Sequence, residues 1–225
     1  MVASVASVDV KSLNLWKQQL GTVPASVWQN TALETLILAD NGLTELSDAI
    51  GALTRLRTLD LGHNQLTDLP ESLGQLAGLS DYLYLHDNRL TALRESLFAS
   101  LTKLRYLNVS DNQLTHLPNS IGALGSLEEF RADGNQLDTL PESFRELGRL
   151  HELHLRNNRF RELPTALRGL RRLSYLDLRG NPFTELPGWI VEWPNLQKLD
   201  LRWVNLQSVP PAIATLEERG CRVLL

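Results

Sequence analysis

Few side chains in this 225-residue sequence have both the type and the spacing that covalent or metal chemistry needs. His63, His86 and Asp87 could approach one another and offer a metal ion two imidazoles and a carboxylate, but they lack the fixed spacing of ligand motifs. A histidine with a carboxylate could serve a hydrolase, and Cys221 could serve a ligase. Because no nucleophile comes with a base and an orienting group, we expect no catalytic residue. Because the spacing of ligand motifs is absent, we also expect no metal, and we expect no cofactor.

Aromatic and basic residues that suit protein recognition recur at regular distances along the chain. Tyr82 and Tyr106 are 24 residues apart, and Arg156, Arg179 and Arg202 follow one another at intervals of 23 residues. Tyrosine and arginine anchor protein interfaces more often than most residue types. Whether these residues can act together depends on the elements that carry them.

A sequence repeat that contains one asparagine indicates which structural elements carry these residues. Each copy follows L-x-L-x-x-N-x-L, in places with another apolar residue for a leucine, and successive asparagines are 23 or 24 residues apart. A constant period of this length predicts a solenoid, in which each unit stacks on the next. The seven asparagines are Asn41, Asn64, Asn88, Asn112, Asn135, Asn158 and Asn181.

The same frame extends to both ends of the chain without its asparagine, with Gln18 and Val204 at the equivalent positions. We therefore expect one domain over residues 1–225. It would contain nine repeats, the first at about residues 10–32 and the last at about residues 196–218.

Alternation within the repeat predicts its secondary structure. Leucines of L-x-L alternate with polar residues, so that Leu59 and Leu61 would face a core. Thr58, Asp60 and Gly62 would face outward from the same half-buried strand. After each asparagine, apolar residues three and four apart and a recurrent proline predict a short helix or helical turn. The predicted fold is α/β, a right-handed horseshoe solenoid with a concave parallel sheet of about nine or ten strands and the helical turns on its convex side.

The frame is interrupted in two places and ends in a different pattern. Single insertions within residues 80–82 and 97–100 account for the 24-residue spacings. Residues 220–225 alternate out of frame and predict a closing strand. Cys221 would then be a buried apolar residue rather than a reactive thiol.

The full unit, L-x-x-L-x-x-L-x-L-x-x-N-x-L-x-x-L-P-x-x-[I/L], appears at residues 53–73 and 147–167. It resembles the intracellular class of leucine-rich repeats, and the resemblance covers the array from end to end. Similar repeats occur in plant Ras-group proteins, animal scaffolds for Ras-type GTPases and secreted bacterial effectors. The resemblance implies that the asparagine amide bonds to the backbone of neighbouring turns. It also implies that the concave face binds a protein or peptide, with small GTPases and other signalling proteins among such partners.

Outward positions of successive strands would form columns on this concave face. All four tyrosines fall in these columns, and His86 and Asn108 join Tyr82, Tyr84 and Tyr106 in a central group. Basic residues continue the surface toward the C-terminus. The predicted partner-binding residues are Tyr82, Tyr84, His86, Tyr106, Asn108, Arg131, His154, Arg156, Tyr175, Arg179 and Arg202.

Charged columns near the C-terminus allow two interpretations, because opposite charges fall beside one another. One is a solvated lattice of ion pairs that adds little to stability, and the other is a docking site for a partner of matched charge. The residues of these columns are Glu129, Arg131, Asp133, Glu152, His154, Arg156, Asp177, Arg179, Asp200 and Arg202.

Composition limits the location and the partners of the chain. A net charge of −4 disfavours nucleic acid and anionic membranes as partners, and no run approaches the roughly 20 apolar residues of a membrane span. Residues 1–10 lack the basic segment and long apolar run of a signal peptide, and a single cysteine excludes an internal disulfide. We expect a cytoplasmic monomer, or alternatively a secreted bacterial effector that acts in a host cytoplasm.

The sequence therefore favours a non-catalytic protein-binding module. One alternative is an array that associates with itself through weakly capped ends, and another is an enzyme or ligase component.

Overall fold

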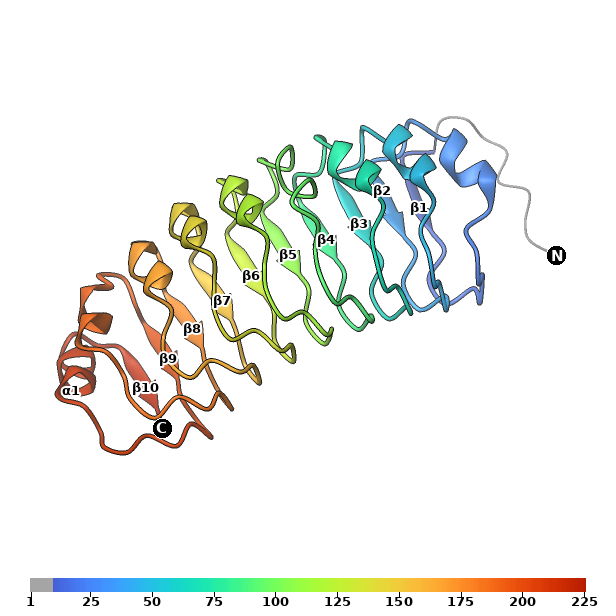
Figure 1. The fold of residues 1–225 in the computed structure, drawn as a ribbon. Helices are drawn as coiled ribbons and strands as arrows, with labels where there is room; N and C mark the ends of the chain where they lie inside the picture. Colours follow the sequence, from blue (N-terminus) through green and yellow to red (C-terminus); the bar gives the residue numbers. More distant parts are fainter. Residues whose placement is uncertain (1–9) are drawn as a thin grey trace.

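Ten parallel strands form one open sheet in the computed structural model, which describes residues 10–225 (Figure 1). The strand order follows the chain, and each strand aligns with the next so that equivalent residues of neighbouring repeats form rows. Residues 1–9, part of the segment expected to lack a signal peptide, lie outside the described part. The strands are β1 (Ser12–Asn14), β2 (Thr35–Ile37), β3 (Thr58–Asp60), β4 (Tyr82–Tyr84), β5 (Tyr106–Asn108), β6 (Glu129–Arg131), β7 (Glu152–His154), β8 (Tyr175–Asp177), β9 (Lys198–Asp200) and β10 (Arg222–Leu224).

Helical turns form a row of their own beside the strands, as the sequence predicts (Figure 1). They are the 3-10 helices η1 (Ala25–Gln29), η2 (Asp48–Ala52), η3 (Glu71–Gln75), η4 (Asn119–Ala123), η5 (Glu142–Glu146), η6 (Thr165–Gly169) and η7 (Gly188–Glu192), and the α-helix α1 (Pro211–Glu218). No helix in residues 10–225 combines the length and the apolar character needed to cross a membrane.

The residue before each helical turn explains where the turn begins. A proline precedes most of them, because its fixed φ suits the start of a helix. Ser47 replaces the proline before η2, and its hydroxyl accepts a hydrogen bond from the amide of Ala49 at 3.2 Å. Arg94 replaces it in the fourth repeat, where residues 95–100 form turns and bends instead of a helix.

The leucines of the strand pattern fill a core that runs through the whole array. Leu59 and Leu61 are fully buried, as predicted. Leu13 in β1 is only partly buried, since β2 is the one described strand beside it. At the other end, α1 packs on η7, and β10 pairs with β9 as the closing strand. Cys221, just before β10, is buried, whereas Leu225 is exposed.

The asparagine of each repeat bonds to the backbone of its own repeat and of the preceding one, which confirms its expected role. Nδ2 of Asn112 donates to the carbonyl oxygens of Leu85, Val109 and Ser110 at 3.0, 3.0 and 3.1 Å. Its Oδ1 accepts a hydrogen bond from the amide of Leu90 at 3.0 Å. Equivalent bonds recur at the other asparagines, including both ends of the series. These buried amides satisfy backbone groups that would otherwise lack partners.

One predicted insertion is absorbed just before β4. The amides of Ser80, Asp81 and Tyr82 all point to the carbonyl oxygen of Arg57, at distances of 3.3, 3.0 and 3.4 Å. Two amides share the equivalent carbonyl in the preceding repeat. The rows of the sheet therefore remain aligned after the extra residue, and Tyr82 stands beside Thr58.

Candidate binding surface

Three tyrosine rings lie against one another in the middle of the sheet. The ring centroid of Tyr106 is 5.5 Å from that of Tyr82 and 5.0 Å from that of Tyr84, and the other two are stacked at 5.8 Å. Tyr82 exposes 45% of its surface, whereas Tyr84 and Tyr106 are half-buried. Burial raises the pKa of Tyr106 to about 12, so its phenol stays protonated even in moderately alkaline solution. We name Tyr82, Tyr84 and Tyr106 the tyrosine cluster.

His86 extends the tyrosine cluster toward β3. Its ring centroid is 5.9 Å from that of Tyr84 and 4.8 Å from that of His63, with edge-on geometry in both contacts. The ring lies over Gly62, where an added Cβ atom would clash with it. Gly62 is therefore buried, although its position in the repeat predicts an outward residue. Burial, with the nearby charge of His63, lowers the pKa of His86 and favours its neutral form.

The three residues that the sequence offers as metal ligands do come together. Ligand atoms of His63, His86 and Asp87 lie within 4.8 Å of one another. His63 Nδ1 is 3.2 Å from Asp87 Oδ2, and these two side chains expose 56% and 41% of their surface. The close approach of His63 and Asp87 at the surface thus needs no metal to explain it.

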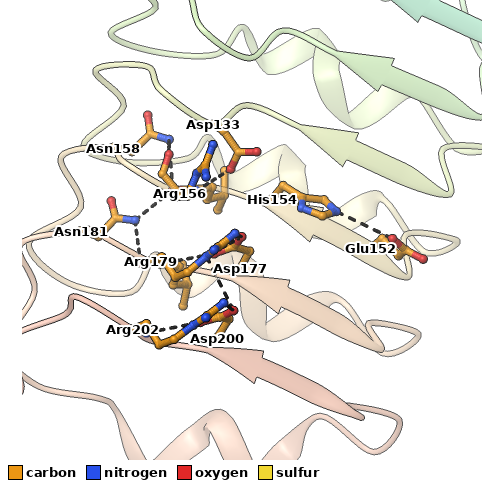
Figure 2. Close-up of polar contacts among 12 residues, drawn as sticks. Asp133, Glu152, His154, Arg156, Asn158, Asp177, Arg179, Asn181, Asp200 and Arg202 are labelled. Carbon is orange, nitrogen blue, oxygen red and sulfur yellow. Dashed lines mark hydrogen bonds and ion pairs between the residues drawn. The ribbon is translucent and has the colours of Figure 1, made fainter. Parts of the chain in front are cut away.

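A second group consists of two aspartates at the ends of β8 and β9 and the two arginines that follow these strands (Figure 2). Arg179 donates to the carboxylate of Asp177 from Nε at 2.9 Å and from Nη2 at 2.6 Å. Arg202 donates to Asp200 in the same way, at 2.9 and 2.8 Å. Arg179 Nε also lies 3.6 Å from Asp200 Oδ2, which links the two pairs. We name these four residues the charged ladder.

The charged ladder is not the solvated lattice that the sequence allowed. Asp177 is 1% exposed and Asp200 is fully buried, so their carboxylates have lost contact with water. Burial opposes ionisation of Asp200, but the hydrogen bonds from Arg202 outweigh it and hold the pKa of that carboxyl below its ordinary value. Hydrogen bonding to Asp177 raises the pKa of Arg179. The arginines thus neutralise charges that the fold has buried.

Trp203 borders the charged ladder. The arginine head groups of Arg179 and Arg202 lie 5.7 and 6.0 Å from its ring centroid. The side chain is 71% exposed, and the residue has a φ of 65°, a left-handed conformation that is unfavourable for a bulky residue. The sequence gives no sign of this backbone conformation at a tryptophan.

Between the tyrosine cluster and the charged ladder lie β6 and β7. Arg131 Nε is 2.5 Å from Glu129 Oε1. His154 is buried, and its ring meets that of Tyr175 edge-on at 5.0 Å. The ammonium of Lys198 lies 4.4 Å from the ring centroid of Tyr175. Tyr175 therefore belongs to this region, and the structure does not bring it to the tyrosine cluster.

Two other side chains of the predicted surface, those of Asn108 and Asp133, accept hydrogen bonds from backbone amides. Asn108 Oδ1 accepts a hydrogen bond from the amide of Ser110 at 3.0 Å. The amide of Arg156 donates to Asp133 Oδ1 at 2.7 Å, and burial raises the pKa of that aspartate. The polar atoms of Asn108 and Asp133 are thus partly committed to the fold.

A hollow of about 370 Å³ beside the tyrosine cluster contains residues that the sequence interpretation missed. Residues directly before successive strands alternate in charge there, with Arg57 3.3 Å from Asp81 and Arg105 2.7 Å from Glu128. This alternation is visible in the sequence as one residue per repeat before each strand. The lining residues are Arg57, Asp81, Tyr82, Arg105, Tyr106, Glu128, Glu129 and His151.

Two arginines on the helical side are paired with acids. Arg168 donates to Glu192 at 2.8 and 2.5 Å. Arg145 lies 3.6 Å from Glu142, on the same helical turn. Neither arginine stands as an isolated positive charge available to an anion.

Family models support the repeat frame directly. Leucine rich repeat models match residues 81–137 and 139–183, and a two-copy Leucine Rich repeat model matches residues 31–75. The chain has no significant match among curated proteins.

Solved structures of other repeat proteins superpose over most of the chain. The leucine-rich repeat domain of the type III effector XopL shares 28% identity, with a TM-score of 0.80 over 96% of this chain and 76% of that one. A Leptospira interrogans leucine-rich-repeat protein shares 28% identity, with a TM-score of 0.71 over 96% of this chain and 66% of that one.

A plant receptor ectodomain supplies a third match. The ectodomain of the Arabidopsis thaliana membrane receptor kinase GASSHO1/SCHENGEN3, in complex with CASPARIAN STRIP INTEGRITY FACTOR 2, shares 30% identity with a TM-score of 0.77. The match covers 91% of this chain but only 26% of the ectodomain. The repeat frame, the buried asparagines, the ten-stranded sheet and these matches agree, and the chain belongs to the leucine-rich-repeat proteins.

Proposed function

We propose that this chain is a non-catalytic module that binds a protein or peptide on its concave face. The tyrosine cluster is the observation that carries the proposal, because three rings touch one another and Tyr82 is 45% exposed. Aromatic rings on a pre-ordered surface offer a large contact area with little loss of conformational freedom. The plant receptor ectodomain in complex with its factor supports the same use of the repeat.

The hollow beside the tyrosine cluster suggests which part of a partner would enter. Its walls carry both Arg105 and Glu128, next to the exposed ring of Tyr82. A partner segment with an apolar side chain followed by polar or charged groups would complement these walls. His86, Arg131 and the other predicted residues outside the charged ladder would extend the contact along the sheet.

A peptide selection tests this proposal even though the natural partner is unidentified. Peptides selected from a random library on the wild-type protein would be measured against the double variant Tyr82→Ala with Tyr106→Ala. We expect affinity to fall by at least about 100-fold, since two central aromatic anchors are lost.

The matched control is Arg145→Ala with Arg168→Ala on the helical side, which should bind as tightly as wild type. Loss of binding in the control together with full binding in the tyrosine variant would refute the concave site. Circular dichroism on all variants would establish that each is folded.

The location, the oligomeric state and the class of partner belong to the same proposal. We propose a cytoplasmic monomer in which residues 1–225 act as one unit, with small GTPases or other signalling proteins as a partner class. Similarity to a type III effector domain supports the alternative of action inside a host cell. Burial of Cys221, which raises the pKa of its thiol, argues against a ligase role.

Self-association through the N-terminal edge is the rival function, and a specific feature favours it. Trp16 follows β1, the first described strand, and is 55% exposed. Light scattering over a range of concentrations distinguishes the two functions. A constant mass near 25.3 kDa supports the monomer, whereas a mass that grows with concentration supports self-association.

A further inference from the structure

Two glutamates and a histidine converge on the sheet between the tyrosine cluster and the charged ladder. Glu129 on β6 and Glu152 on β7 are register partners, so like charges stand beside each other. His154 Nε2 lies 3.8 Å from Glu129 Oε1 and 3.7 Å from Glu152 Oε2. Figure 2 shows the imidazole directed toward Glu152. One ligand atom from each residue lies within 4.8 Å of the others.

The histidine supplies a second and independent observation. His154 is only 7% exposed, and its Nε2 is buried without a hydrogen-bond partner among the described residues. A buried ring nitrogen in this condition carries a desolvation cost. A cation held between this nitrogen and the two carboxylates would remove that cost and the repulsion between the glutamates.

We propose that Glu129, Glu152 and His154 bind a divalent transition-metal ion, with Zn²⁺ as the best fit. In a tetrahedral zinc site, bonds of about 2.0–2.2 Å place ligand atoms roughly 3.3–3.6 Å apart. The two distances from His154, 3.8 and 3.7 Å, are close to this range, and the two carboxylates, whose ligand atoms lie within 4.8 Å of each other, would have to close around the ion. Three protein ligands leave a fourth position, which water or a partner's side chain would fill.

Ligand chemistry selects among metals. Imidazole favours Zn²⁺, Ni²⁺ and Cu²⁺, whereas Mg²⁺ and Ca²⁺ prefer sites made wholly of oxygen. Arg131 competes for the site, because its Nε lies 2.5 Å from Glu129 Oε1. The metal would share Glu129 with this guanidinium or displace it.

The similar cluster of His63, His86 and Asp87 provides an internal control. His63 and Asp87 are exposed and already contact each other, and His86 is only half-buried, although its Nδ1 also lacks a hydrogen-bond partner among the described residues. The side chain of His154 is more buried than that of His86. A variant at His63 removes an exposed histidine from the same face without touching the proposed site.

Calorimetric titration of the purified, untagged protein with Zn²⁺ at neutral pH tests the proposal. We expect one saturable site in wild type and in His63→Ala. Affinity should fall by more than about tenfold in both His154→Ala and Glu152→Gln, because loss of a ligand costs more than loss of a supporting contact. Glu152→Gln keeps the size of the side chain, so its result stands even if His154→Ala folds poorly.

A second readout is the melting temperature without any partner. Zn²⁺ should raise it for wild type and His63→Ala and leave the two ligand variants unchanged. The proposal is overturned by the absence of saturable binding to wild type. It is equally overturned by binding that survives both ligand substitutions, or by binding that disappears in His63→Ala.

Discussion

The tyrosine cluster and the charged ladder lie on the same sheet and share one column, in which Tyr84 aligns with Asp177 and Asp200, yet they are built in opposite ways. The rings of the tyrosine cluster contact one another, and Tyr82 leaves nearly half of its surface free. In the charged ladder, each arginine is already bound to a carboxylate that the fold has buried. An outward position in the repeat therefore does not by itself provide a contact for a partner.

The two groups differ in the free energy that contact with a partner would gain or cost. A partner that covers Tyr82 removes apolar surface from water, which is favourable. A partner that pulls Arg179 toward itself would leave the carboxylate of Asp177 buried and uncompensated, which is costly. We therefore expect the tyrosine cluster to contribute binding free energy and the charged ladder to contribute mainly stability and shape.

The largest expected effect is on the charged ladder. Arg179→Ala should lower the free energy of unfolding by about 3 kcal/mol, because it removes one partner of a buried ion pair. Urea denaturation would measure this loss. The control is Arg168→Ala, which breaks an exposed pair with Glu192 and should cost much less. Equal losses in the two variants would mean that the buried ion pair contributes no more to the free energy of unfolding than an exposed pair.

The second expected effect is a loss of stability in mild acid, which should differ between the two regions. The folded pKa of His86 is lowered by burial, so its stabilising contribution is present above the unfolded value of about 6.5 and is lost as pH falls below it. Asp200, whose folded pKa is also lowered, loses its contribution only below the ordinary aspartate range of about 3.9. Mild acid should thus weaken the central region before the charged ladder.

Denaturation midpoints at about pH 7.5 and 5.5 would test this order. We expect His86→Asn to reduce the loss of stability between these values, and only in part, because burial also lowers the pKa of His154. A full pH dependence in His86→Asn would show that His86 is not responsible.

A smaller effect of opposite sign is expected at Trp203. Trp203→Gly should raise the free energy of unfolding by up to about 1 kcal/mol, because glycine adopts the observed φ of 65° without strain. Loss of the contacts with Arg179 and Arg202 would offset part of this gain. Thermal and urea denaturation would both report it. A clear loss of stability would instead mean that the ring supports the charged ladder.

The smallest expected effect on stability is at Tyr82. Tyr82→Ala should change the free energy of unfolding by no more than about 0.5 kcal/mol, because the side chain lies largely at the surface. The same variant should weaken peptide binding measurably. A stability loss above about 1 kcal/mol would show that the ring is structural, and the contrast with Arg179 would disappear.

The fold could be predicted because the same information is repeated many times. Each copy of the pattern places two core leucines and one asparagine, so departures such as Phe130 with Ala132 do not disturb the frame. Even the extra residue at 80–82 was predictable from the spacing. Its hydrogen bonding to Arg57 was not, since it depends on how three consecutive amides turn toward one carbonyl.

The surface could be predicted only as a set of outward positions. Asp177 and Thr58 follow the same alternation, but Asp177 is buried, and the arginine of its own repeat, Arg179, is bound to its carboxylate. The direction of His154 toward Glu152 depends likewise on side-chain rotamers, to which the period of the repeat is insensitive. The sequence therefore does not predict the contacts between side chains of neighbouring columns.

The asparagine bonds also determine how this molecule can change its length. Each asparagine joins its own repeat to the preceding one through the same set of backbone groups, so that every joint in the series is chemically alike. A duplicated or deleted unit of 23 or 24 residues would meet the same joint on either side. Growth by whole repeats would thus add a new row of outward side chains while keeping the internal bonding unchanged. An engineered array could lengthen the sheet next to the tyrosine cluster in the same steps.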